Sequence, residues 1–182
     1  GKLICSEVDV IEHAYRCDVF TSFTKGMRHD QVMYQALVET TRAYGIHCVV
    51  EPRKYVYGDA KKNRPDIFWR LSPPLAIDLT IVAPDAVVGA AAAHAAAEKI
   101  DKHHAAVAAF GDVFKPFVLE LQGHLHEDAD DTINRLAKEL LPLQRAAFRR
   151  DIKHAIAVEL ARAKAKQVLS AVAKQFALEW MQ

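Results

Sequence analysis

The chain lacks the features that mark secreted, disulfide-rich and membrane-spanning proteins. Its three cysteines are unevenly spaced and do not make a disulfide framework, which favours a reducing compartment, the cytosol or the nucleus. No apolar run approaches the roughly 18 residues that a membrane span needs, and no signal peptide is visible. We therefore expect neither a membrane partner nor a secreted scaffold.

An excess of charge of one sign is also absent. The chain carries 24 Lys and Arg against 23 Asp and Glu, a formal net charge of +1. This balance excludes a uniformly basic nucleic-acid coat, although it leaves room for a local basic face. Apolar residues make up 51% of the chain, enough for a hydrophobic core. Because the sequence begins with Gly1 rather than Met, we expect it to be an excised piece of a larger protein.

Hydrophobic periodicity predicts an ordered series of helices and strands. Apolar residues recur at helical spacing before Gly45, and a later alanine-rich segment is a helix on propensity alone. The predicted helices are 28–44, 89–110, 128–141 and 144–180, and the predicted strands are 46–53, 66–71, 75–82 and 115–123. This order predicts an α/β fold with a mixed central sheet flanked by helices.

Two acidic residues stand in apolar segments that read as strands. Asp66 opens "DIFWRL", and Asp78 lies inside "LAIDLTIV". An isolated carboxylate there is costly unless it is paired or binds a metal. If the two strands are neighbours, the carboxylates can converge, and a cation between them relieves their repulsion. Oxygen ligands suit Mg²⁺ or Mn²⁺. The alternative is a turn-capping Asp66 and an Asp78 paired with Arg53 or Arg70.

Basic residues accompany the two aspartates. A basic loop leads into Asp66 and can hold a phosphate backbone. Lys99 and Lys102 are three residues apart on the alanine-rich helix and share a face. A lysine directed at the carboxylates can orient an attacking water or neutralise developing charge. The alternatives are a solvated loop and a solvated helix face. The basic residues of the loop are Lys61, Lys62 and Arg64.

The segments together resemble the PD-(D/E)xK nuclease superfamily, whose restriction-endonuclease-like core runs αβββαβ. The closest resemblance is to the restriction-like endonuclease domain of site-specific non-LTR retrotransposons, which insert in ribosomal RNA or spliced-leader RNA genes. "KGMRHDQV" (25–32) is similar to the basic start of the family's first helix. "RPD" (64–66), eleven residues and "DLT" (78–80) resemble the metal-binding core, and "EKIDKHH" (98–104) resembles the helix segment that carries lysines.

The resemblance implies a metal-dependent DNA endonuclease that nicks target DNA and leaves a 3′-hydroxyl for reverse transcription. It implies that Asp66 and Asp78 bind Mg²⁺ or Mn²⁺. Thr80 replaces the lysine usual two residues after the second acid, so Lys99 or Lys102 would supply that charge. Candidates for supporting roles are Arg28, His29 and Glu39. The implied partners are target DNA, the reverse transcriptase and other domains of the same polyprotein, and the element's RNA, in the nucleus.

The N-terminal segment "CSEVDVIEHAYRC" (5–17) resembles the last three ligands of the CCHC zinc knuckle that precedes this nuclease. Those ligands would be Cys5, His13 and Cys17, and the first cysteine would fall at Lys2. Structural zinc takes four ligands, so we do not expect this piece to bind zinc intact. The expected divisions are 1–25 as a knuckle and linker remnant, 26–141 as the nuclease core and 142–182 as extra C-terminal helices.

Other functions remain open on the sequence alone. The same fold would serve as a non-catalytic nucleic-acid-binding module of the polyprotein, positioning other domains without cutting. A Holliday-junction-resolvase-like nuclease or a stand-alone restriction enzyme is a third reading. For two of the supporting residues the alternatives are structural: a helix-capping cluster around His29 and Asp30, and a solvent-exposed Glu39.

Overall fold

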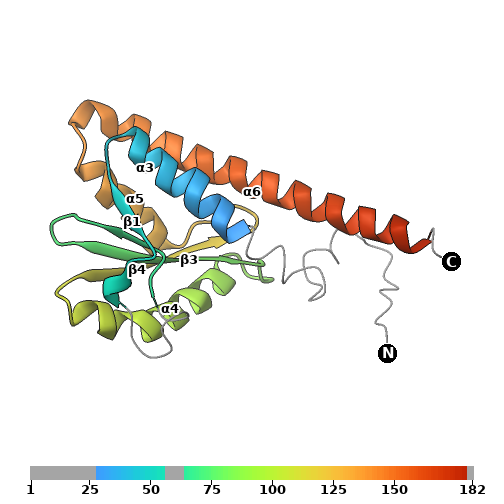
Figure 1. Ribbon diagram of the computed structural model, residues 1–182, viewed down its shortest axis with the longest axis horizontal. Helices are drawn as coiled ribbons and strands as arrows, with labels where there is room; N and C mark the ends of the chain where they lie inside the picture. The colour runs from blue at the N-terminus through green and yellow to red at the C-terminus, as the bar shows by residue number, and fades with distance from the viewer. Residues whose placement is uncertain (1–27, 56–63, 180–182) are drawn as a thin grey trace.

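The computed structural model describes residues 28–55 and 64–179, which form a four-stranded sheet with helices on both faces (Figure 1). The mixed α/β class predicted from the sequence is confirmed. None of the helices in the described residues is long and apolar enough to cross a membrane. The candidate site residues that lie outside the described residues are Cys5, His13, Cys17, Lys61 and Lys62.

The first helical run spans residues 28–43, close to its predicted bounds. Its middle, η1 (Val32–Val38), is π-helical, and its last turn is α3 (Glu39–Ala43). Gly45 follows with φ of 78°, a left-handed conformation that glycine adopts readily at the end of a helix. The side chains that η1 buries are Val32, Met33, Ala36, Leu37 and Val38.

The strands lie in the sheet in chain order. They are β1 (Cys48–Val50), β2 (Ile67–Trp69), β3 (Leu75–Val82) and β4 (Val113–Glu120). The pairs β1–β2 and β2–β3 are antiparallel, whereas β3 and β4 are parallel. A parallel pair needs a long crossover connection, and α4 (Ala90–Ala108) supplies it.

Backbone chemistry explains where the strands depart from their predicted ranges. β3 has the predicted bounds, but β1 stops at Val50 because Glu51 has a positive φ of 48° and Pro52 has no N–H to donate. β4 ends at Glu120, where a turn begins with Gly123 N donating to Glu120 O at 2.8 Å. The positive φ of Glu51 has no signal in local propensity, whereas Pro52 and Gly123 are visible in the sequence.

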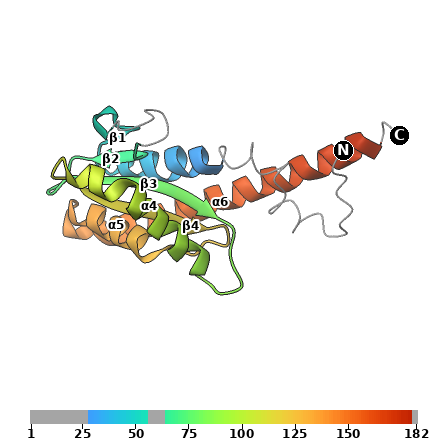
Figure 2. The same cartoon turned by 90° about the horizontal axis from the view of Figure 1, so that it is seen from below.

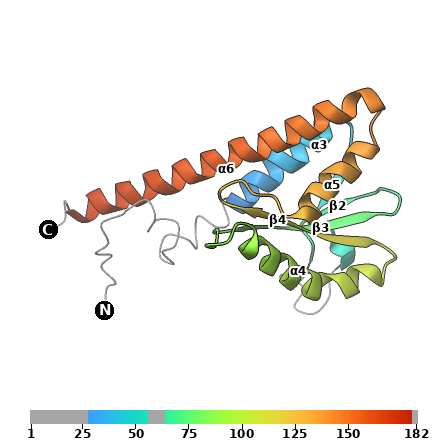
Figure 3. The same cartoon turned by 180° about the vertical axis from the view of Figure 1, so that it is seen from behind.

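The alternation of side chains along the strands separates two layers. Ile77 and Leu79 of β3 belong to the main core, with residues of η1, α5 (Glu127–Lys138) and α6 (Pro142–Glu179). Ala76, one residue before Ile77, points to the other face and packs with Val107 of α4. Figure 2 views the sheet from the side that carries α4, and Figure 3 shows η1, α3 and α6 on the opposite side of the sheet from α4.

The final helix is part of the main core over its first half. It begins at Pro142, slightly earlier than predicted, because proline is tolerated in the first turn of a helix. Each large apolar side chain that it buries contributes about 1.5–3 kcal/mol. Beyond this contact the helix runs on past the sheet (Figure 1). The large apolar residues that it adds to the core are Phe148, Ile152, Ile156 and Leu160.

Candidate active site

The two aspartates lie next to each other on the β2–β3 ladder. The β2–β3 ladder has Ile67 opposite Ile77, and these residues directly follow Asp66 and directly precede Asp78. Asp66 N donates to Ile77 O at 2.8 Å, and Asp66 Oδ2 accepts from Leu79 N at 2.7 Å. Asp66 therefore bonds to the backbone on both sides of Asp78. The backbones of the two residues thus adjoin, while the convergence of their carboxylates on one cation stays a prediction.

Asp78 is buried on the face of β3 that α4 covers, with 5% of its surface exposed. Lys99 Nζ lies 2.6 Å from Asp78 Oδ1, and His103 Nε2 lies 2.8 Å from Oδ2. Burial raises the pKa of the carboxyl, but His103 and Lys99 outweigh burial and hold the pKa below its usual range. The Asp78 carboxylate is therefore ionised at neutral pH.

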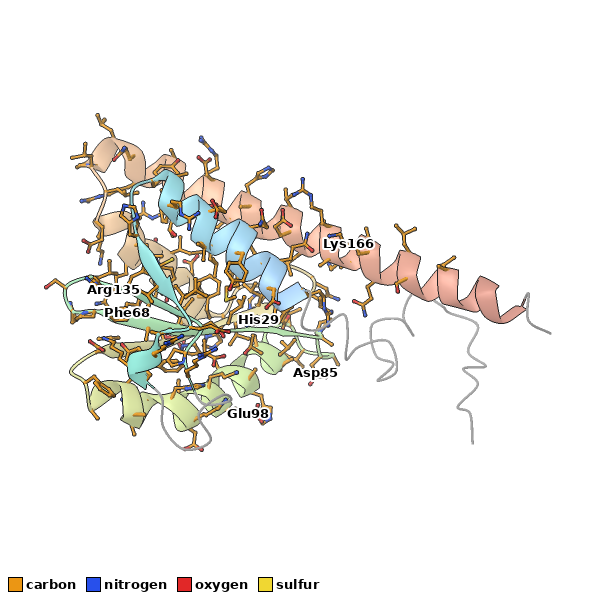
Figure 4. The ribbon with its side chains drawn as sticks, viewed as in Figure 1. His29, Phe68, Asp85, Glu98, Arg135 and Lys166 are labelled. Atoms are coloured by element: carbon orange, nitrogen blue, oxygen red, sulfur yellow. The ribbon has the colours of Figure 1, made fainter. Side chains whose placement is uncertain are left out.

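Asp66 has a different cationic neighbour, from the opposite layer. His29 Nε2 lies 3.0 Å from Asp66 Oδ2, and its Nδ1 lies 3.2 Å from Asp30 Oδ1. Burial lowers the pKa of His29, but the hydrogen bonds and charges of Asp66 and Asp30 outweigh it and raise the pKa to about 9. The imidazole is therefore cationic at neutral pH. Figure 4 shows His29 where the first helix meets the sheet.

A buried apolar cluster lies beside His103 on the α4 side of the sheet. Its members are Tyr55, Phe68, Ala76, Val107 and Phe114. The His103 ring lies 5.2 Å from the Phe114 ring, between centroids. Phe68 is labelled in Figure 4. This cluster gives the buried side of the site a packed apolar wall.

Hydrogen bonds among Lys54, Tyr55 and Asp112 stabilise one edge of the same cluster. Lys54 Nζ lies 2.6 Å from Asp112 Oδ2, and the Tyr55 hydroxyl donates to the same oxygen at 2.5 Å. The Lys54 ammonium also lies 3.7 Å from the centroid of Phe68, a cation–π contact. Burial raises the pKa of Asp112, but Lys54 and Tyr55 outweigh it and hold the pKa below its usual range. The start of β4 is thus tied to the segment that precedes β2.

The remaining predicted residues have other surroundings. Lys102 is exposed, so of the two candidate lysines it is Lys99 that contacts Asp78. Glu39 is half exposed and pairs with Arg42 at 2.6 Å. Arg64 pairs with Glu51. Arg28, by contrast, is buried.

His103 is the residue at this site to which the sequence assigned no role. Its spacing of four from Lys99 is a signal that could have found it, because residues four apart on a helix share a face. The partners of Asp78 are Lys99 and His103, so the predicted alternative of pairing with Arg53 or Arg70 is wrong.

The donors at this site fit a hard divalent cation. Mg²⁺ is commonly bound by one or two carboxylates and keeps several waters. The chain offers the carboxylate of Asp66, which accepts from Leu79 N, and that of Asp78, the residue before Leu79. Within residues 28–55 and 64–179, no group of three or more His, Cys, Asp or Glu side chains could hold a metal ion. Asp66 and Asp78 are the two ligands that the sequence predicts.

Comparison with known proteins gives no match that would assign this site. No protein-family model matches the chain, and no curated protein matches it at a significant level.

Proposed function

We propose that this domain is a metal-dependent DNA endonuclease of the PD-(D/E)xK type, belonging to a non-LTR retrotransposon polyprotein. It would nick target DNA to give a 3′-hydroxyl primer for reverse transcription in the nucleus. The observation that carries the proposal is that the Asp66 carboxylate accepts from Leu79 N, the residue after Asp78, while Lys99 reaches Asp78 from α4. Two adjacent carboxylates and a lysine are the side chains that phosphodiester hydrolysis of this type requires.

The two aspartates would hold Mg²⁺ or Mn²⁺, which when bound lowers the pKa of water and stabilises charge on a phosphodiester. Lys99 provides a positive charge against the same carboxylate, where a lysine can orient the nucleophile or neutralise the developing phosphate charge. Thr80, two residues after Asp78, has no charge to offer, so the lysine comes from the crossover helix instead. This arrangement supports assigning Lys99, rather than Lys102, the catalytic role.

The supporting residues fall into two groups. His29 is cationic and only partly buried, so it can contact a phosphate next to Asp66. The exposed Lys102 and the basic residue Arg64 can add sequence-independent backbone contacts. The reverse transcriptase, other domains of the polyprotein and the element's RNA are the partners that this proposal implies.

A non-catalytic nucleic-acid-binding module is the second candidate. The observation that favours it is that each aspartate already has a cationic neighbour, His29 for Asp66 and Lys99 for Asp78. Such pairing satisfies both carboxylates without a metal. The two candidates predict the same DNA binding but different responses to Mn²⁺.

The test is nicking of supercoiled, bubble and branched DNA by the purified domain with Mn²⁺. We expect Asp66→Asn and Asp78→Asn to abolish nicking and leave most DNA binding intact, because neither change removes a basic residue. Lys99→Met should reduce the rate by roughly 100-fold or more, the size of effect typical of one positioned charged group. The matched variant Lys102→Met should lose much less activity.

Two outcomes decide between the candidates. Nicking that persists in Asp66→Asn with Asp78→Asn, after removal of contaminating nucleases, would contradict the catalytic assignment. A wild-type domain that binds these substrates and nicks none of them would establish the binding module.

A further inference from the structure

The two oxygens of Asp78 are held by side chains of different character. Oδ1 faces Lys99, whose side chain is 24% exposed, and Oδ2 faces His103, whose side chain is fully buried. A lysine is a long chain with many rotamers, so its ammonium can leave Oδ1 without disturbing the core. A buried imidazole has no such freedom.

Packing against Phe114 of β4 holds the His103 ring in place. The ring lies 5.2 Å from Phe114 of β4, with an interplanar angle of 38°. Phe114 belongs in turn to the buried cluster with Phe68 and Tyr55. Protein interiors are close-packed, so turning the imidazole away from Asp78 would require this cluster to rearrange. His103 is thus the fixed contact of Asp78 and Lys99 the movable one.

We infer that His103 is a positioning residue for the proposed metal site: it fixes Oδ2 of Asp78 so that Oδ1 is the oxygen offered to the cation. This inference rests on the proposed nuclease function. Replacing a residue that hydrogen-bonds to a metal-ligating side chain typically lowers metal affinity or activity by roughly 10- to 100-fold. Lys99, which now contacts Oδ1, would yield that oxygen to the cation and remain beside it.

The experiment measures Mn²⁺ affinity by isothermal titration calorimetry, which needs no turnover. His103→Phe keeps an aromatic ring against Phe114 but removes both nitrogens, and we expect it to weaken Mn²⁺ binding roughly 10- to 100-fold. DNA binding without metal should stay unchanged, because a buried residue makes no contact with DNA. The matched control is His104→Phe, at the exposed neighbouring position of α4, and it should bind Mn²⁺ as the wild type does.

A second pair of variants keeps the test decisive if His103→Phe does not fold. His103→Gln retains a donor that can reach Oδ2, whereas His103→Asn is shorter and cannot. We expect Mn²⁺ affinity to fall in the order wild type, His103→Gln, His103→Asn. Folding of each variant is checked by circular dichroism and urea denaturation before the titration.

The outcomes separate this inference from the proposal on which it depends. A wild-type domain that binds no Mn²⁺ would overturn both. If the wild type binds Mn²⁺ and the folded His103 variants bind it equally well, the positioning role is wrong while the nuclease proposal stands. Equal losses in His104→Phe and His103→Phe would also overturn the role, because they would show a general effect of altering this helix.

Discussion

Replacing His29 with glutamine removes the cation beside Asp66 and should change how stability depends on pH. The pKa of His29 rises from 6.5 to about 9 in the folded protein, because the contacts with Asp66 and Asp30 outweigh burial. A shift of this size corresponds to about 3 kcal/mol. The side chain is 28% exposed, so solvent screening reduces the expected contribution to about 1–2 kcal/mol.

The sign of the effect follows from proton binding. The folded protein binds this proton more tightly than the unfolded chain does, so the stabilisation is complete below the unfolded pKa of 6.5. It is lost as the pH rises through about 9. The free energy of unfolding of the wild type should therefore exceed that of His29→Gln by about 1–2 kcal/mol at pH about 6, and the difference should vanish near pH 10.

The assay is urea denaturation of both proteins across this pH range, in a chelating buffer that keeps divalent ions away from Asp66. His47→Gln, at an exposed position before β1, is the matched control and should give a difference that does not vary with pH in this way. A constant difference between wild type and His29→Gln from pH about 6 to about 10 would refute the coupling of His29 to Asp66.

Two further predictions concern the scaffold around the site. Glu120 is fully buried and its Oε1 accepts from Gly89 N at 3.0 Å and Ala92 N at 3.4 Å, at the start of α4. Glu120→Ala should therefore cost about 1–2 kcal/mol of unfolding free energy, measured by urea denaturation; a loss below about 0.3 kcal/mol would contradict this capping role. Phe148 lies fully buried in the main core, so Phe148→Ala should cost about 3–5 kcal/mol in thermal or urea unfolding. A near-neutral Phe148→Ala would mean that α6 does not pack on the core as described.

The parts of the fold that the sequence predicts well are those with strong local signals. The strand over 75–82 is a long apolar run between prolines, and α4 is an alanine-rich segment between Gly89 and Gly111. The bounds of β1 were predicted less well, because the positive φ of Glu51 has no signature in the sequence. The π-helical form of η1 was not predicted, since a change from four- to five-residue hydrogen bonding leaves the apolar pattern nearly the same.

Some residues of the candidate site could also be predicted from the sequence, and others could not. Asp66 and Asp78 stand out from the sequence because a charge inside an apolar strand needs a partner. The choice between Lys99 and Lys102 could not be made, because both lie on one broad face and only the rotation of α4 on the sheet decides which reaches Asp78. His103 was missed because a histidine among polar neighbours resembles a solvated residue, and its burial comes from Phe114, which lies beyond the helix in sequence.

The length of α6 has a mechanical consequence for the polyprotein that we propose. At 1.5 Å per residue, its 38 residues span ~57 Å, about twice the ~26 Å of the eight-residue β3. After Pro142 the helix contains neither proline nor glycine, the usual causes of sharp kinks. Its near half is anchored in the same core as Ile77 and Leu79, the two neighbours of Asp78 in β3, so the helix behaves as a stiff rod. A domain attached at its far end would be held at a set distance and orientation from the proposed cutting site.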